Sequence, residues 1–158
     1  MKILITGSRG FIGRNLKVAL ERIEGIDVFG YDKDSTKQEL KQFSEEVDII
    51  FHLAGTNRIE SNEDSFSNNI KLTENLLNLL SEKKDTSTLV FASSIQAKRE
   101  NEYGRSKRIA EQYIQDWSKR SSNKAFVFRL HNVFGKWSRP DYNSVVATFC
   151  YNIARSKE

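Results

Sequence analysis

Three glycines near the amino terminus constrain the fold of this chain more than any other feature. Residues 1–13 read Met-Lys-Ile-Leu-Ile-Thr-Gly-Ser-Arg-Gly-Phe-Ile-Gly, so Gly7, Gly10 and Gly13 follow a short apolar run and precede a helical pattern. Such a turn lets the backbone approach a pyrophosphate, whose charge faces the free N–H groups of the helix. An ordinary tight turn is the alternative, but the strand and the helix that a dinucleotide site requires are both present. The segment therefore predicts dinucleotide binding.

The size and cysteine content describe one domain without a disulfide. A chain of 158 residues is long enough to bury roughly 70% of its unfolded surface. Cys150 is the single cysteine, which favours a reducing, cytoplasmic compartment. The apolar run at residues 3–5 is far too short for a signal-peptide core or a membrane span.

The charge pattern favours a small anionic ligand over a macromolecule. The chain has 25 basic and 21 acidic residues, but the two signs interleave along it. A nucleic-acid binder usually gathers its basic residues in one stripe. We therefore expect neither a nucleic acid nor a membrane as partner, and two histidines with one cysteine provide no metal-ligand cluster.

Short apolar runs alternate with helical patterns along the chain. We expect strands at residues 3–5, 26–31, 49–53, 89–92 and 125–130, and helices at residues 11–23, 36–45, 66–82 and 104–120. The apolar runs alternate only weakly, as in strands covered on both faces, and the helices carry apolar residues three and four apart. This order predicts an α/β fold, a Rossmann-like, doubly wound parallel sheet.

The last segment, residues 142–158, reads as a helix with a polar tail, and no strand follows it. A six-stranded dinucleotide fold needs one more strand after such a helix. We therefore expect residues 1–158 to be an NAD(P)-binding Rossmann domain that is truncated before its last strand. Exposed apolar side chains around Val145, Val146 and Phe149 then permit a homo-oligomer.

Tyr103 and Lys107 form a candidate catalytic pair. Four residues apart, they lie on one face of a helix, and a nearby ammonium favours the phenolate, so Tyr103 could exchange a proton at neutral pH. The preceding strand ends in Ser93 and Ser94, which places a hydroxyl donor at the edge where open α/β sheets bind ligands. A chance surface pair is the alternative.

With these motifs in this order, the chain resembles the extended short-chain dehydrogenase/reductase family, in its nucleotide-sugar branch of NAD-dependent epimerases and dehydratases. The resemblance is carried by Gly7-x-x-Gly10-x-x-Gly13, Asp48-Ile-Ile-Phe-His-Leu-Ala-Gly55, Asn69-Ile-Lys-Leu-Thr-Glu-Asn-Leu-Leu77, Phe91-Ala-Ser-Ser94, Tyr103-x-x-x-Lys107 and Arg129-Leu-His-Asn-Val-Phe-Gly135. It implies Tyr103 as the acid/base, and Lys107 as its pKa partner and a ligand of the nicotinamide ribose. It also implies Ser94 as the hydroxyl that orients the carbonyl and Asn69 as part of a proton-relay water chain.

Other stretches resemble one subfamily, the bifunctional enzymes of capsular polysaccharide synthesis. These are Asn57-Arg58, Ser93-Ser-Ile-Gln-Ala97, Phe134-Gly-Lys-Trp137 and residues 139–155. The subfamily reduces a 4-keto UDP-sugar with NADPH and carries a C-terminal cupin domain, which we expect to be absent from this chain, as is the substrate subdomain. The resemblance implies a nucleotide-sugar substrate, with Asn57, Arg58, Asn132, Lys136, Arg139 and Asn143 as candidate contacts. Trp137 and Tyr142 are open between a core role and a role in this site.

The identity of the cofactor depends on three residues with opposite implications. An acid at the end of the second strand, here Asp32, ordinarily binds the ribose 2′-OH of NAD. Arg9 and Lys33 are both able to meet a 2′-phosphate. We predict NADPH over NADH. The cofactor-binding candidates are Gly7, Arg9, Gly10, Phe11, Ile12, Gly13, Asp32, Lys33, Leu53, Ala54, Gly55 and Lys107.

The predicted function is an NADPH-dependent reductase of a UDP-4-keto-6-deoxy-N-acetyl sugar in capsular or surface polysaccharide biosynthesis. One alternative is an NAD-dependent nucleotide-sugar epimerase or dehydratase, which recycles its cofactor. A second is a non-catalytic dinucleotide-binding sensor, which would not need Ser94, Tyr103 and Lys107 together. His52, within an apolar run, is expected to be a core histidine rather than a base or a ligand.

Overall fold

Five parallel strands form a single sheet in the computed structural model, which describes residues 1–56 and 65–157. The strands are β1 (Lys2–Thr6), β2 (Asp27–Tyr31), β3 (Ile49–His52), β4 (Thr88–Ser94) and β5 (Lys124–Leu130). The helices are α1 (Phe11–Leu20), α2 (Lys37–Glu46), α3 (Ser65–Glu82), α4 (Glu102–Arg120) and α5 (Val145–Ile153), with a short 3-10 turn, η1 (Ile95–Lys98), between β4 and α4. The predicted alternation of strands and helices is confirmed.

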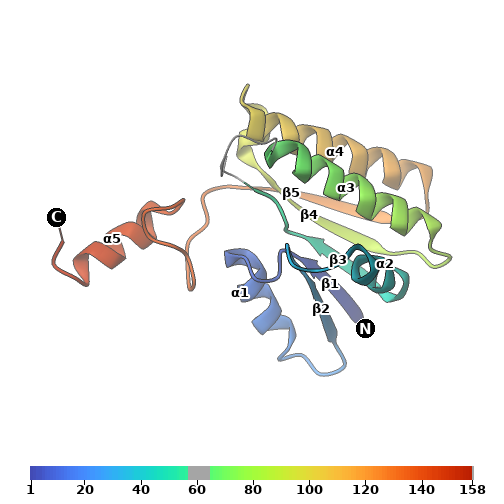
Figure 1. The fold of residues 1–158 in the computed structure, drawn as a ribbon, viewed down its shortest axis with the longest axis horizontal. Helices are drawn as coiled ribbons and strands as arrows, with labels where there is room; N and C mark the ends of the chain where they lie inside the picture. Colours follow the sequence, from blue (N-terminus) through green and yellow to red (C-terminus); the bar gives the residue numbers. More distant parts are fainter. Residues whose placement is uncertain (57–64, 158) are drawn as a thin grey trace.

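The strand order is β2-β1-β3-β4-β5. Strand β2 lies on one side of β1 and β3 lies on the other. The connection from β1 to β2 and the connection from β2 to β3 therefore run in opposite directions across the sheet. Right-handed crossovers therefore place α1 on one face of the sheet and α2, α3 and α4 on the other, where α3 contacts both α2 and α4 (Figure 1). The sheet is doubly wound, and its switch point lies between β1 and β3.

The hydrophobic core lies between the sheet and the layer of α2, α3 and α4. Its fully buried side chains include Leu4 and Ile50 from the central strands, Phe91 from β4, and Leu76 and Ile114 from the helices. The expectation that all strands are covered on both faces is wrong for β5, because its outward Phe126 and Phe128 are exposed. Helix α5 lies apart from the sheet in Figure 1 and buries none of its residues.

Local sequence explains where the helices begin. Thr36 and Glu39 form a reciprocal capping box at the start of α2. The Asn101 side chain accepts a hydrogen bond from the Gly104 backbone N–H at the start of α4, and Ser144 caps α5 in the same way. The predicted helix over residues 142–158 is therefore shorter than expected, and it begins only after this cap. None of the described helices is long and apolar enough to cross a membrane.

Candidate functional site

The glycine turn packs too tightly to accept side chains. A Cβ atom on Gly13 would lie 2.1 Å from the carbonyl oxygen of Gly7, so only glycine lets α1 start this close to the end of β1. Gly10 is the N-cap of α1, and no side chain caps the first N–H groups of that helix. These N–H groups and the positive end of the helix dipole can therefore receive a phosphate.

Asp32 is held by the turn itself. Its two carboxylate oxygens accept hydrogen bonds from the Ser8 hydroxyl at 2.6 Å and from the Arg9 backbone N–H at 3.0 Å. The Arg9 guanidinium forms an exposed ion pair with Asp34 at 2.6 Å and lies 3.8 Å from Asp32. The hydrogen bond between the Arg9 guanidinium and the Asp34 carboxylate raises the pKa of Arg9 and lowers the pKa of Asp34. Asp32, which favours NAD, and Arg9, which favours NADPH, thus lie side by side.

Ser94, Tyr103 and Lys107 come together at the carboxyl end of β4. Ser94 is the last residue of that strand, and Tyr103 and Lys107 lie on the first turns of α4. The Lys107 ammonium donates a hydrogen bond to the Ala92 carbonyl oxygen at 2.9 Å and lies 4.7 Å from the centre of the Phe91 ring. Burial lowers the pKa of Lys107 to about 8, against the opposing charge of Glu111.

The pKa of Tyr103 moves in the direction opposite to our expectation. Burial disfavours the phenolate and raises this pKa, and a hydrogen bond with the Ser94 hydroxyl lowers it by less. The Lys107 ammonium lies 5.8 Å from the centre of the Tyr103 ring and points to Ala92 instead of the phenol oxygen. The tyrosine is therefore held as a neutral phenol, which is the form that can donate a proton.

Asn69 and His52 have partners within the protein. The Asn69 amide exchanges two hydrogen bonds with the Thr56 backbone, at 2.8 and 2.9 Å, directly before residues 57–64. His52 is buried, with its ring nitrogens 2.7 Å from the Thr6 hydroxyl and 3.0 Å from the Thr73 hydroxyl. Burial lowers the pKa of His52 to about 3, which confirms the predicted core histidine.

One cleft of about 550 Å³, at the carboxyl edge of the sheet, connects the glycine turn with Ser94, Tyr103 and Lys107. Of the predicted residues, it is lined by Gly7, Arg9, Gly10, Phe11, Ile12, Gly13, Lys33, Leu53, Gly55, Ser94, Tyr103, Lys107, Asn132, Arg139 and Asn143. Asp32, Ala54, Asn69 and Lys136 do not line it, and Asn57 and Arg58 lie outside the described residues. A larger hollow of about 850 Å³, between the far ends of α3 and α4, contains none of the predicted residues.

The segment after β5 supplies the other wall of the cleft. Trp137 and Tyr142 line this cleft. Three residues that we did not predict line it as well: Thr56, Gln96 and His131. Trp137 has a φ of 67°, a left-handed conformation that a large side chain rarely adopts outside special sites. The one sequence signal for these residues was their place after the end of a parallel strand. Among the described residues, no cluster of three or more His, Cys, Asp or Glu side chains could hold a metal ion.

Comparison with known proteins decides the family. Residues 3–158 match the NAD dependent epimerase/dehydratase family. The chain belongs to this family. A UDP-2-acetamido-2,6-beta-L-arabino-hexul-4-ose reductase from Pseudomonas aeruginosa is a family relative that is 46% identical over 155 residues, which are 98% of this chain and 42% of that protein.

Solved structures agree with this family assignment. The capsular polysaccharide assembling protein CapF from Staphylococcus aureus is 36% identical, with a TM-score of 0.86 over 100% of this chain and 42% of its own. RMD from Pseudomonas aeruginosa, complexed with NADPH, is 23% identical, with a TM-score of 0.82 over 98% of this chain and 61% of its own, and shows the fold alone. The predicted resemblance to proteins of capsular polysaccharide synthesis and the predicted Rossmann-like fold are confirmed. The chain spans 42% of the length of the P. aeruginosa reductase and of CapF.

Proposed function

We propose that residues 1–158 are the NAD(P)-binding domain of an NADPH-dependent reductase of a UDP-4-keto-6-deoxy-N-acetyl sugar, which works in capsular or surface polysaccharide biosynthesis. The cleft in which the glycine turn meets Ser94, Tyr103 and Lys107 carries this proposal. The similarity to the P. aeruginosa reductase and to CapF supports the substrate class and the capsular role. The exposed, unpaired Cys150 suits the reducing cytoplasm, where we place the reaction.

The residues present fit a dinucleotide. The start of α1, where Gly10 is the N-cap and no side chain caps the N–H groups, suits a pyrophosphate, and Lys107 lies across the cleft, suited to a ribose. When bound, NADPH supplies a hydride to the carbonyl carbon of the sugar. The protein has to hold the carbonyl in place and deliver one proton to its oxygen.

Tyr103 and Ser94 are the groups that act on this oxygen. Because burial keeps Tyr103 protonated, its hydroxyl can give a proton to the oxygen as negative charge develops there. The Ser94 hydroxyl, hydrogen-bonded to the same phenol, orients the carbonyl. The Lys107 ammonium then stabilises the phenolate that remains until a proton returns to it. We also propose that Asn69, whose side-chain amide is hydrogen-bonded to the Thr56 backbone, takes part in a proton-relay water chain.

The preference for NADPH rests on Arg9 and Lys33. Both residues line the cleft beside Asp32, and Arg9 offers a guanidinium to a 2′-phosphate. Asp34 already binds this guanidinium, so the phosphate has to replace a carboxylate as its partner. For the substrate, we propose Asn132, Arg139 and Asn143, which line the cleft, together with Lys136. We also propose Asn57 and Arg58, which lie outside the described residues, and a substrate subdomain and cupin domain beyond residues 1–158.

Counting the cofactor separates this function from its alternatives. The test uses the complete gene product that contains this chain, supplied with NADPH and UDP-2-acetamido-2,6-dideoxy-hexos-4-ulose. A reductase forms one NADP⁺ for each sugar reduced, whereas an epimerase or dehydratase converts sugar with no net oxidation of its cofactor. Sugar conversion without NADP⁺ would refute the reductase, and cofactor binding with no conversion of any sugar would favour the sensor.

A further inference from the structure

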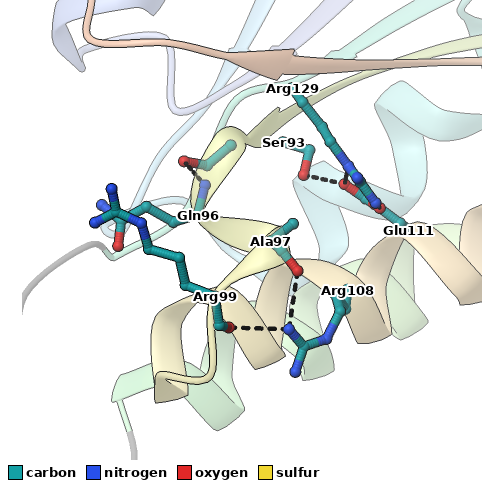
Figure 2. A network of polar contacts seen from close by, with 8 residues as sticks. Ser93, Gln96, Ala97, Arg99, Arg108, Glu111 and Arg129 are labelled. Carbon is teal, nitrogen blue, oxygen red and sulfur yellow. Dashed lines mark hydrogen bonds and ion pairs between the residues drawn. The ribbon is translucent and has the colours of Figure 1, made fainter.

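A buried carboxylate lies one helical turn beyond Lys107 and has no part in the chemistry described above. Glu111 is 5% exposed. It accepts a hydrogen bond from the Ser93 hydroxyl and a forked pair from Arg129, at 2.9 Å from Nε to Oε1 and 2.6 Å from the terminal nitrogen to Oε2 (Figure 2). Burial raises the pKa of Glu111, but these hydrogen bonds hold it below its usual range. The carboxylate is therefore charged at neutral pH.

The three residues join every element that shapes the catalytic end of the cleft. Ser93 and Arg129 are direct neighbours in the register of β4 and β5, and Glu111 reaches both strands from α4. Ser93 precedes Ser94, and Glu111 lies on the helix that carries Tyr103 and Lys107. The Glu111 carboxylate is buried, whereas the Arg129 side chain is 40% exposed, so this ion pair gives little net stability. Its place beside Lys107 suggests a role in the site.

The surroundings of the Lys107 ammonium contain few charges. From α4 it faces the neutral Tyr103 and the anionic Glu111, and from β3 the neutral His52. From β4 it meets the Phe91 ring and the Ala92 carbonyl, and from the loop after β3 the backbone of Gly55. Arg129 on β5 binds the Glu111 carboxylate, whose charge acts on Lys107 from one helical turn away. Among the described residues, Glu111 is the anion whose charge supports the protonated lysine.

We propose that Glu111 and Arg129 are positioning residues that together set how tightly Lys107 holds its proton. The carboxylate favours the ammonium, and Arg129 limits that effect by neutralising part of the carboxylate's charge. The proposal rests on the proposed function only in giving Lys107 a role at the cofactor ribose. The ion-pair geometry itself does not depend on that role.

This arrangement has a property that a purely structural ion pair lacks. Glu111→Gln removes the negative charge and leaves the positive charge of Arg129 without a partner. Both effects weaken the hold of Lys107 on its proton. Arg129→Met leaves the full carboxylate charge facing the lysine, so the proton is held more tightly. Arg129→Lys keeps the positive charge and should restore nearly the original value. Ser93→Ala removes an uncharged donor and serves as the matched control.

The test follows the titration of Lys107 directly. The cofactor-free 158-residue chain is prepared with ¹³Cε-labelled lysine, and its NMR signals are followed from pH 6 to 11, with Lys107→Gln identifying the resonance. We expect the proton affinity of Lys107 to fall about threefold to tenfold in Glu111→Gln and to rise by a similar factor in Arg129→Met. Circular dichroism establishes that each variant is folded.

The outcomes are decisive without any turnover measurement. If both charge variants shift Lys107 in the same direction, or if neither shifts it, the proposal is wrong even if the chain proves to be a reductase. If Glu111→Gln does not fold, Arg129→Met and Arg129→Lys decide alone: a shift in the first that is absent in the second supports the proposal, and equal titrations overturn it. Opposite shifts would support it even if the proposed substrate proved wrong.

Discussion

Tyr103 is the residue on which the proposed chemistry depends most. Its ring packs against Phe66, with 5.9 Å between ring centres, and its hydroxyl is hydrogen-bonded to Ser94. The position of the ring therefore does not depend on the hydroxyl alone. Removing the oxygen should take away the proton donor and leave the shape of the cleft unchanged.

We expect Tyr103→Phe to lower kcat about 10²- to 10⁴-fold in the complete gene product, because proton transfer to the carbonyl oxygen is lost. NADPH affinity should stay nearly the same, since Lys107 and the aromatic ring remain. Steady-state kinetics and calorimetry measure the two quantities. Tyr113→Phe, on the same helix and outside the cleft, is the control. Near wild-type turnover in Tyr103→Phe would exclude this mechanism.

Arg9 and Asp34 provide a test of cofactor preference. Arg9→Ala should weaken NADPH binding by roughly fivefold to tenfold and leave NADH binding unchanged, because only NADPH carries the 2′-phosphate. Asp34→Asn frees the guanidinium from its present partner and should tighten NADPH binding. Calorimetry at low salt measures all four affinities, with the exposed Arg22→Ala as control. The NADPH assignment fails if NADH binds wild type equally tightly and Arg9→Ala changes neither affinity.

His52 makes the folded chain sensitive to acid. Its pKa is about 3 in the folded chain and near 6.5 when unfolded, so the unfolded chain binds more protons between these values. The contribution of neutral His52 to the free energy of unfolding is therefore fully present above pH 6.5 and decreases as the pH falls toward 3. At pH 5 the free energy of unfolding is lower by about 2 kcal/mol. Urea unfolding at pH 7.5 and 5 should show this loss in wild type and a smaller one in His52→Gln. An equal loss in both proteins would contradict the prediction, and the exposed His131→Gln controls for the residue change.

At the scale of elements, sequence patterns located most of the fold because they depend on neighbours along the chain. The glycine spacing and the apolar runs indicated β1 to β5 in order, and leucines three and four apart indicated α3. The ends were less well predicted. The helix over residues 11–23 ends at Leu20, and β4 extends to Ser94 because β5 pairs with it along its whole length.

The parts of the site that sequence missed depend on contacts across the fold. Glu111 and Arg129 are 18 positions apart on a helix and a strand, so no local spacing relates them. The pKa direction of Tyr103 was wrong because desolvation outweighs a nearby ammonium, and burial depth is not visible in a motif. For Trp137 the sequence left a core role and a site role open, and the structure places it in an irregular segment that lines the cleft.

The short connection from β4 to α4 is fixed by a close approach at Gly104. A Cβ there would lie 2.2 Å from the Gln96 carbonyl oxygen, and Arg108 ties α4 to the carbonyl oxygens of Ala97 and Arg99 at 2.9 Å each (Figure 2). Alanine normally stabilises a helix relative to glycine. Here we expect Gly104→Ala to destabilise the protein by about 1–3 kcal/mol, because η1 has to move away.

Thermal unfolding of Gly104→Ala measures this loss of stability, with the exposed Arg105→Ala as control on the same turn. Because the displaced segment lies between Ser94 and Tyr103, turnover of the complete gene product should also fall. A Gly104→Ala variant as stable as wild type would show that η1 yields without cost.

At the scale of the whole molecule, the layers leave one end of the sheet uncovered. Strand β5 is the last in the sheet order, and α5 lies apart from the sheet (Figure 1). On α5, Phe149 and Ile153 are 61% and 79% exposed. A free sheet edge and exposed apolar side chains on a helix that lies apart from the sheet both favour contact with another chain. We expect the 158-residue chain to bind NADPH without reducing sugar by itself and to self-associate as its concentration rises.

Sedimentation velocity at two concentrations in reducing buffer measures this association. The pair of substitutions Phe149→Ser and Ile153→Ser should shift the chain toward monomer, and Cys150→Ser on the same helix should not. A wild-type chain that stays monomeric and turns over the sugar at rates typical of enzymes would contradict both expectations.

The parallel strand order also governs when the cleft forms during synthesis. The glycine turn leaves the ribosome first, but the walls that complete the cleft extend to residue 144. At least one helix separates the two strands of every neighbouring pair along the chain, so no strand pair forms by a local hairpin. A dinucleotide therefore has no complete site to bind on a nascent chain. Cofactor in the cell should slow the unfolding of the finished domain and leave the rate of its folding almost unchanged.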